Sequence, residues 1–313
     1  MIGENRMKKI VYIGGMRSMI VYLFYNIKYL KNTIFLFEND YKLNLKNKYI
    51  LDNSGNKDIK RYRNYKYLNQ ITSRDEEKEF WIQDHLNYSP YFLVKFKNIN
   101  LLEDGLDNYN SKLIKKKIRY NLKNKLLGGT FKLDRSTYGI SKSISKIYLT
   151  GMREIPEEIR EKVELINLKK LWEKMSEEEK KEILKVFNIR KEEMEIFKKR
   201  RIILITQTIS EDTQITEEEK IDIYRKILSK YNENEILIKP HPREVTDYKK
   251  YFKNIEILRR EIPMEMISFL VENLEEVITL FSTSAFEFKD VCKVKFLGTE
   301  YDERLVKNYG IIK

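Results

Sequence analysis

The sequence predicts an α/β protein built from two doubly wound domains. The chain has 313 residues, more than a single ordinary core accommodates, and 42% of them are apolar, so two domains can each bury a core. In both halves, short strand-like runs of apolar residues alternate with amphipathic helical runs. This alternation is typical of parallel sheets covered by helices.

The first half opens with a strand, a glycine turn and a helix. Residues 9–15 predict a buried strand that ends at Gly14 and Gly15, and a helix and a second strand follow at about 18–30 and 32–37. Glycine in such a turn lets a ligand approach the backbone closely, which makes Gly14 a candidate ligand contact. The spacing is not that of a dinucleotide-binding fingerprint.

The remainder of the first domain is more polar, and residues 42–69 show no clear period. The pattern predicts four further elements: a helix at 76–86, a strand at 91–96, a strand at 98–102, and a basic helix at 111–127 closed by Gly128 and Gly129. Asp104 lies in the Glu-Asp-Gly run that follows the strand at 98–102.

Residues 156–199 differ in composition from the residues before them. They are rich in charged residues and follow a helical pattern throughout. Ser176 stands three residues before Glu179, the pattern of a capping box at a helix start. We expect this segment to be a helical connection, so the predicted division is 1–155, 156–199 and 200–313.

The second domain repeats the strand–helix alternation in a compact form. Its predicted strands lie at 201–206, 235–239, 255–258, 277–281 and 294–297, and its predicted helices at 217–231, 264–272 and 285–289. This order predicts a second doubly wound sheet.

The net charge of +13 has two explanations. Clustered Lys and Arg attract an anionic partner or membrane surface. The chain is also rich in Lys, Asn and Ile and has Ala285 as its single alanine, which indicates a coding bias that raises lysine regardless of function.

Composition excludes several classes of protein. With one cysteine, Cys292, no intramolecular disulfide forms, and with two histidines far apart a His-based metal site is not expected. The first nine residues are polar, and no run approaches the ~20 apolar residues that span a bilayer. We therefore expect a cytoplasmic protein, with its basic surface available to rest on the inner membrane face.

Three polar clusters follow predicted strands of the second domain, at 207–212, 240–243 and 282–284. Ligands of doubly wound sheets bind outside the carboxyl ends of the strands. His241 stands between two prolines that stiffen its backbone, and with Arg243 it can bind a phosphate. The alternative is a histidine that caps a loop.

Other candidates also have two readings. Ser282, Thr283 and Ser284 precede a predicted helix and form either an anion site or an ordinary N-cap. Glu265, in a first helical turn, either accepts two ribose hydroxyls or complements the helix dipole. Asp104 is either a base that faces a cleft or a turn residue. His85 is expected to be structural.

The motifs at 101–105, 236–244 and 280–285 together resemble those of bacterial sialyltransferases of glycosyltransferase family 52. These enzymes add sialic acid to lipooligosaccharide. The set is specific because three motifs occur in the same order and at matching spacing.

The resemblance implies a GT-B fold, with an acceptor-side N-terminal domain and a nucleotide-sugar-binding C-terminal domain. It implies CMP-sialic acid as donor, inversion at the anomeric carbon, and neither metal nor cofactor. His241 would meet the donor phosphate as acid or electrostatic stabiliser. The donor-binding residues would be Gly14, Pro242, Arg243, Glu265, Ser282, Thr283 and Ser284.

Two positions are candidates for the catalytic base. Some related families use the Asp of the Asp-Gly motif, here Asp104. In family 52 a carboxylate after the first strand of the second domain has this role, which indicates Asp212 or the adjacent Glu211.

The expected partners are a nucleotide-sugar donor and a glycan or glycolipid acceptor. The inner membrane surface and a second copy of the chain are further candidate partners. Nucleic acid is not an expected partner. Two alternatives stay open: the same fold with another donor such as a glucosyl nucleotide, and a basic polyanion-binding protein without turnover.

Overall fold

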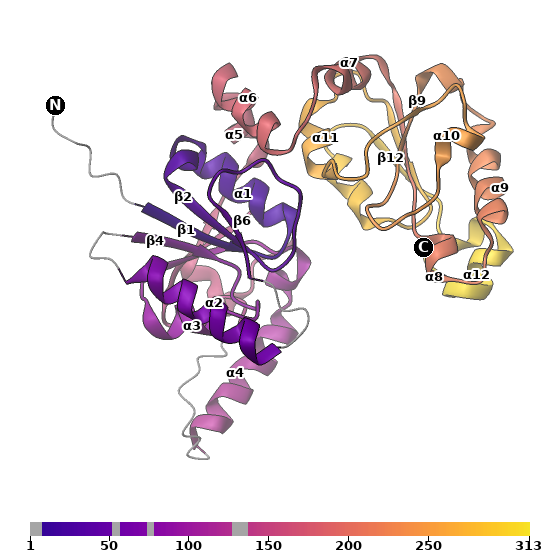
Figure 1. The fold of residues 1–313 in the computed structure, drawn as a ribbon. Helices are drawn as coiled ribbons and strands as arrows, with labels where there is room; N and C mark the ends of the chain where they lie inside the picture. The colour runs from indigo at the N-terminus through magenta and orange to yellow at the C-terminus, as the bar shows by residue number, and fades with distance from the viewer. Residues whose placement is uncertain (1–7, 52–56, 74–77, 127–136) are drawn as a thin grey trace. The chain divides into compact units, whose positions relative to one another are not determined.

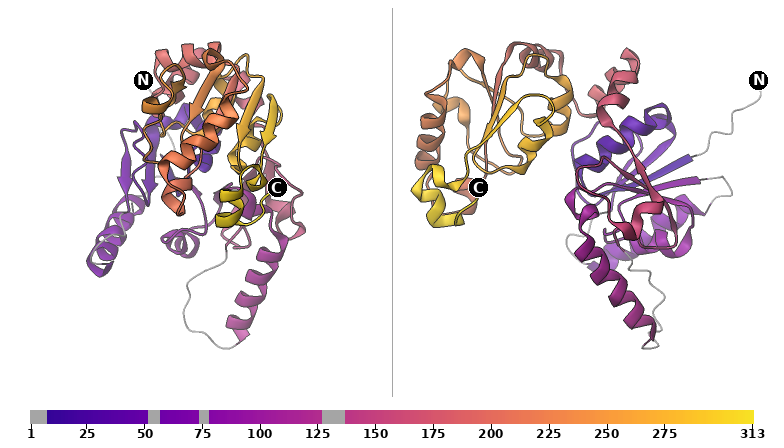
Figure 2. Two further views of the ribbon diagram at one scale, coloured as in Figure 1. Left: turned by 90° about the vertical axis from the view of Figure 1, so that its right-hand side faces the viewer. Right: turned by 180° about the vertical axis from the view of Figure 1, so that it is seen from behind.

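The computed structural model describes residues 8–51, 57–73, 78–126 and 137–313. The chain divides into two compact units, Met1–Val186 and Phe187–Lys313. Each unit contains one parallel sheet with helices on both of its faces (Figure 1, Figure 2). The predicted α/β class with two doubly wound sheets is therefore confirmed.

The sheet of the first unit has seven strands in the order β3-β2-β1-β4-β5-β6-β7. Their bounds are β1 Lys8–Ile13, β2 Thr33–Phe37, β3 Lys48–Ile50, β4 Lys78–Ile82, β5 Ile99–Leu102, β6 Ile144–Leu149 and β7 Val163–Leu165. Strand order reverses between β1 and β4, and such a switch point leaves a crevice at the carboxyl ends of these strands.

Alternation along β1 separates the two faces of this sheet. Ile10 and Tyr12 belong to a core that also takes side chains from α2 (Lys57–Thr72), α3 (Ser89–Lys95) and α4 (Ser111–Leu126). The opposite face packs against α1 (Met16–Asn26), where Tyr22 meets the rings of Phe35 and Trp81 edge-on.

The second sheet has the order β10-β9-β8-β11-β12, again parallel throughout. Its strands are β8 Ile202–Ile205, β9 Ile236–Lys239, β10 Glu256–Ile257, β11 Glu276–Thr279 and β12 Lys293–Phe296. Its helices are α7 Lys191–Lys199, α8 Ile209–Asp212, α9 Glu217–Leu228, α10 Tyr248–Tyr251, α11 Met264–Leu270 and α12 Glu303–Tyr309. The strand order reverses between β8 and β11.

Two predictions in the first unit are wrong. The predicted helix at 76–86 contains strand β4, because Phe80, Trp81 and Ile82 are buried between β1 and β5. The predicted strand at 91–96 is helix α3, because Pro90 occupies the start of this helix, where its missing N–H costs nothing.

Other elements had no predicted counterpart. The aperiodic region 42–69 contains β3 and most of α2, and β6 and β7 extend the sheet beyond β5. The predicted helix at 111–127 is α4, while its glycine ending at 128–129 lies outside the described residues.

The predicted helical connection at 156–199 is divided between the two units. β7 joins the first sheet, and Trp172 of α5 (Leu168–Lys174) stacks on Phe24 with ring centroids 5.4 Å apart. α7 instead belongs to the second unit, where Glu193 pairs with Arg259 at 2.6 Å. Long-range packing of each piece, which helical periodicity does not reveal, causes this division.

Candidate functional site

The carboxyl ends of β9, β8 and β11 lie side by side in the second sheet. Gln207, His241 and Ser282 follow these strands within a few residues, so the three predicted polar clusters share one edge at the switch point.

Gln207 links two of these strand ends. Its N–H donates to the Tyr224 hydroxyl at 2.9 Å, and its Oε1 accepts the Phe281 N–H at 2.9 Å. This residue fell inside a predicted cluster, but no sequence signal indicated that its amide would fix the β11 end.

The imidazole of His241 has a defined orientation. Its Nδ1 accepts the Arg243 N–H at 3.2 Å, so in the neutral ring the proton is on Nε2, which is left to donate to a ligand. Burial, with the nearby Arg243 charge, lowers the pKa of His241 below its usual value. This shift favours the neutral ring.

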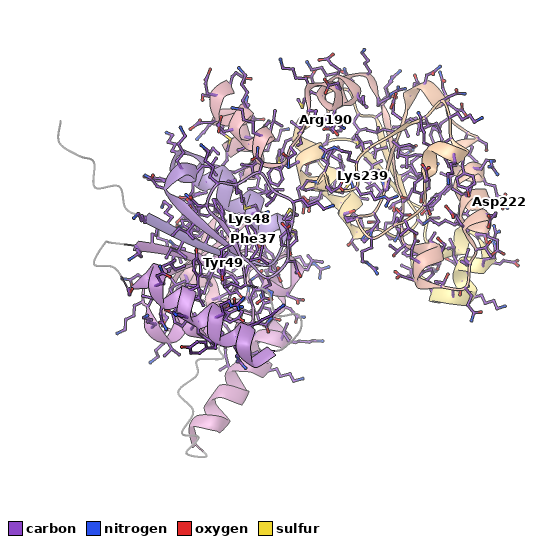
Figure 3. The ribbon with its side chains drawn as sticks, viewed as in Figure 1. Phe37, Lys48, Tyr49, Arg190, Asp222 and Lys239 are labelled. Carbon is purple, nitrogen blue, oxygen red and sulfur yellow. The ribbon has the colours of Figure 1, made fainter. Side chains whose placement is uncertain are left out.

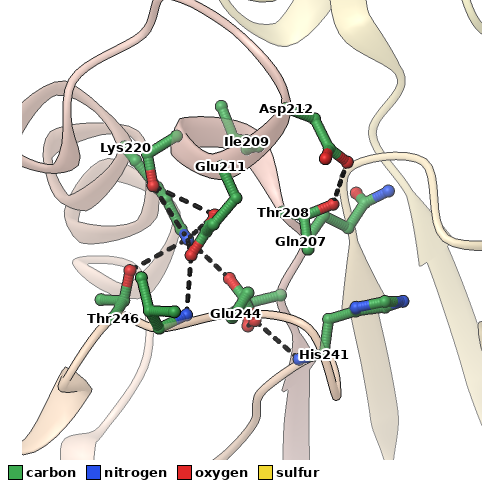
Figure 4. Close-up of polar contacts among 12 residues, drawn as sticks. Gln207, Thr208, Ile209, Glu211, Asp212, Lys220, His241, Glu244 and Thr246 are labelled. Atoms are coloured by element: carbon green, nitrogen blue, oxygen red, sulfur yellow. Dashed lines mark hydrogen bonds and ion pairs between the residues drawn. The ribbon is translucent and has the colours of Figure 1, made fainter. Parts of the chain in front are cut away.

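A buried ionic cluster lies beneath the His241 turn (Figure 4). Glu244 accepts the His241 N–H at 2.6 Å and pairs with Lys220 at 2.8 Å, and both of these charged side chains are fully buried. Lys220 also pairs with Glu211 at 2.9 Å. Lys220 lies in α9, and nothing in the sequence separated it from the many surface lysines.

Arg243 binds the last residue of α8. Its two terminal nitrogens bind the Asp212 carboxylate at 3.1 and 2.9 Å, and the ion pair holds the pKa of Asp212 below its usual range. Arg243 and Asp212, which are both predicted site residues, thus form an ion pair with each other.

Glu211, the alternative base, is bound on the other side of α8. It accepts the Val245 N–H at 2.9 Å besides its pair with Lys220. Burial alone would raise the pKa of Glu211, but these two donors outweigh burial and lower it. Its carboxylate serves to tie α8 to the 240–246 loop.

The Ser-Thr-Ser run differs from its prediction. The expected helix at 285–289 is a 3-10 helix, η5 (Thr283–Phe288), and its N-cap Ser282 makes no side-chain cap bond. The Ser282 and Ser284 hydroxyls instead bond each other at 2.8 Å, and Thr283 is exposed. The hydroxyls lie at the strand end, but a short 3-10 helix provides fewer aligned amides than the α-helix predicted.

Glu265 lies in the first turn of α11, as predicted. Upstream of it lies the buried Lys239, which is labelled in Figure 3. Its ammonium donates to the carbonyls of Pro240 at 2.8 Å and Arg260 at 3.0 Å. Burial lowers the pKa of Lys239 to about 8. This lysine ties the His241 loop to the segment that leads to Glu265. Pro242 is exposed in that loop.

The first unit has its own polar cluster at a strand edge. Asp104, at the end of β5, lies 3.2 Å from Nε2 of His85 and accepts a hydrogen bond from Gln83. Its own N–H donates to Asn108 at 2.7 Å. His85, expected to be structural, is therefore a neighbour of the predicted base; the wrong helix at 76–86 concealed its place just after β4.

Gly14 has a packing explanation. Its N–H donates to Gln83, and its carbonyl accepts from the Tyr41 hydroxyl. A Cβ at this position would stand 2.5 Å from Cδ2 of Leu86. A side chain at position 14 would therefore displace the end of the Leu86 side chain, which gives glycine a packing role here, and contact with a donor stays a prediction.

Comparison with known proteins identifies the family. The model of glycosyltransferase family 52 matches residues 39–300. The chain belongs to glycosyltransferase family 52. All the predicted site residues except Gly14 lie inside the matched range.

Individual relatives and solved structures are also similar to this chain. An uncharacterized protein from Haemophilus influenzae is 40% identical over 238 residues, which cover 76% of this chain and 74% of that protein. Among solved structures, a sialyltransferase from Photobacterium damsela has a TM-score of 0.59 at 14% identity over 90% of this chain and 72% of its own.

A second solved structure is similar to the same extent. The 2,6-sialyltransferase of Photobacterium sp. JT-ISH-224, in complex with CMP and lactose, has a TM-score of 0.60 at 12% identity, covering 93% of this family 52 chain and 71% of its own. At such identities the likeness shows the fold, which is GT-B.

In the described part of the chain, no helix has the length and apolar character needed to cross a bilayer.

Proposed function

We propose that this family 52 glycosyltransferase is an inverting sialyltransferase that moves sialic acid from CMP-sialic acid to a galactose-type hydroxyl of a lipooligosaccharide or similar surface glycan. The reaction needs neither metal nor cofactor. The second unit binds the donor, and the first unit contacts the acceptor.

The observation that carries this proposal is the orientation of the His241 imidazole. Because its Nδ1 accepts the Arg243 N–H, its Nε2 can donate at the switch point of the second sheet to a phosphate that gains negative charge as it leaves. The Ser282 and Ser284 hydroxyls at the adjoining strand end can bind the same group, and Glu265, in the first turn of α11, can accept hydrogen bonds from ribose hydroxyls.

The base that takes the acceptor proton is Asp104 or Asp212. Asp104 has a histidine partner, as a base that must be oriented often has. Asp212 is kept ionised by Arg243, and an acceptor hydroxyl would have to share its oxygens with the guanidinium. These two arrangements lead to different mutant results.

The donor experiment incubates the protein with CMP-sialic acid, UDP-glucose or UDP-galactose, a lactose acceptor, and EDTA in a parallel sample. We expect a sialylated product from CMP-sialic acid that EDTA does not reduce. H241A should lower kcat by about 100-fold or more, because a lost donor to the leaving oxygen costs this much in comparable sites. Turnover of a UDP-sugar alone would make the chain a family 52 enzyme with another donor, and no turnover by a folded protein would refute transfer.

The base experiment compares D104N and D212N with D222N. Asp222 is a half-buried residue of α9 that pairs with Lys226 and Arg304, and it is the matched control. Loss of the base should reduce kcat by about 100-fold with CMP binding retained. Equal, small effects of both substitutions would show that neither carboxylate takes the proton.

A further inference from the structure

We propose that Glu244 is a positioning residue for His241, and that buried Lys220 holds Glu244 in place. Together they fix the tautomer and direction of the imidazole. The effect on turnover rests on the proposed role of His241 at the donor phosphate, whereas the effect on the tautomer does not.

Glu244 binds four donors from four different parts of the second unit. Its Oε2 accepts the His241 N–H at 2.6 Å and the Thr206 hydroxyl at 2.5 Å. Its Oε1 accepts the Tyr248 hydroxyl at 2.6 Å and pairs with Lys220 at 2.8 Å. A carboxylate held by the end of β8, the loop, α10 and α9 has no freedom to rotate.

The His241 turn is closed on this carboxylate. Besides the bond from His241 N–H to the Glu244 side chain, the Glu244 N–H donates to the His241 carbonyl at 3.1 Å. These two bonds fix the backbone of 241–244, and this backbone directs the Arg243 N–H at Nδ1 of His241. Movement of Glu244 therefore releases the bond that decides the tautomer.

Lys220 fastens both sides of the same turn. Its ammonium is fully buried and binds Glu244 on one side and, on the other, Glu211, which in turn accepts the Val245 N–H at 2.9 Å. It also donates to the Thr246 hydroxyl at 3.0 Å. An isolated charge at this depth would be strongly disfavoured, so the buried ammonium of Lys220 compensates the carboxylate of Glu244.

The first test measures the tautomer directly by NMR on 15N-histidine-labelled protein. The chain has only two histidines, so H85N assigns the His241 signals. We expect the Nε2–H tautomer to dominate in the wild type and a mixture of tautomers or imidazolium in E244Q. E193Q is the matched control, because Glu193 is also a buried glutamate of this unit but pairs with Arg259, and it should leave the His241 signals unchanged.

The second test is a double-mutant cycle on donor turnover. E244Q should lower kcat by about 10- to 100-fold, as expected for a misaligned catalytic group, and should add less than about 3-fold to the loss in H241A. E193Q should add its full effect to H241A. If E244Q does not fold, Y248F, which removes one donor to the same carboxylate, should shift the tautomer in the same direction by a smaller amount.

The outcomes separate the two claims. An unchanged His241 tautomer in E244Q and Y248F, or full multiplication of the E244Q and H241A losses, would overturn the positioning role. A wild-type kcat in H241A would instead overturn the proposed phosphate contact, while the tautomer result would still decide the role of Glu244.

Discussion

Asp84 shows at the scale of a single residue how the first unit uses a buried charge. Its carboxylate, next to His85, accepts the N–H groups of Tyr138 at 2.9 Å and Gly139 at 2.8 Å. Both of these residues have positive φ, 63° and 87°, a conformation that costs energy for Tyr138. Asp84 thus holds an unfavourable turn against the end of β4, and burial raises its pKa to about 6.

The pKa of Asp84 predicts a pH-dependent stability difference. The pKa of Asp84 in the folded protein lies above the ordinary value of 3.8, so folding favours the protonated carboxyl. The stability that this provides is fully present below pH 3.8 and is lost as pH rises through about 6. D84N removes the charge, but its amide nitrogen cannot accept one of the two N–H groups that Asp84 accepts, so D84N should be less stable than the wild type at pH 4. Its free energy of unfolding relative to the wild type should rise by up to about 3 kcal/mol between pH 4 and pH 7.5, because the wild type loses the stability of the protonated carboxyl.

Urea unfolding followed by tryptophan fluorescence measures this difference. Both tryptophans, Trp81 and Trp172, belong to the first unit and report its unfolding. A gap between D84N and wild type that is the same at pH 4 and pH 7.5 would contradict the assignment of the titration to Asp84.

At the scale of elements, α6 (Glu177–Val186) shows which helix starts depend on local sequence alone. The Glu179 N–H donates to the Ser176 hydroxyl at 3.2 Å, and the Ser176 N–H donates to the Glu179 carboxylate at 2.9 Å. The capping box predicted from the sequence is therefore confirmed.

Removing this cap should weaken the first unit without altering its fold. S176A should lower the free energy of unfolding by about 1 kcal/mol, because the Glu179 N–H loses its acceptor. S176D retains an acceptor and should stay near the wild-type value. Urea midpoints from the fluorescence of Trp172, in the neighbouring α5, measure both; equal losses in the two variants would show that the hydroxyl cap does not act as inferred.

At the scale of the whole molecule, part of the excess positive charge is concentrated in helix α4. α4 has seven lysine and arginine residues and no acidic residue among its sixteen. Within its first two turns, Lys112, Lys115 and Lys116 are exposed, and Lys115 pairs with Glu158 at 3.2 Å. We propose that this helix provides the contact of the enzyme with an anionic inner membrane surface.

Vesicle binding tests this contact. The wild type should co-sediment with vesicles rich in phosphatidylglycerol at low salt and dissociate as ionic strength rises, because exposed charges are screened. K112E/K116E should bind several-fold more weakly. K174E/K181E changes the net charge equally at exposed positions of α5 and α6 and should bind like the wild type; equal weakening would mean that the total charge, and not α4, drives binding.

The sequence by itself determined the features that depend on local pattern. Apolar runs such as 202–205 and 236–238 are apolar enough to predict buried parallel strands, and a parallel arrangement brings their carboxyl ends together. His241 and Ser282 could thus be assigned to one edge without coordinates, and the capping box at Ser176 needed only residues three apart.

The tertiary structure alone decided what depends on distant partners. Residues 78–82 are a strand because neighbours on both sides pair with them, and this placed His85 beside Asp104. Lys220 is one lysine among many until α9 packs over the His241 turn and removes it from water next to Glu244. Burial and long-range pairing, rather than residue type, set these roles, so local pattern could not reveal them.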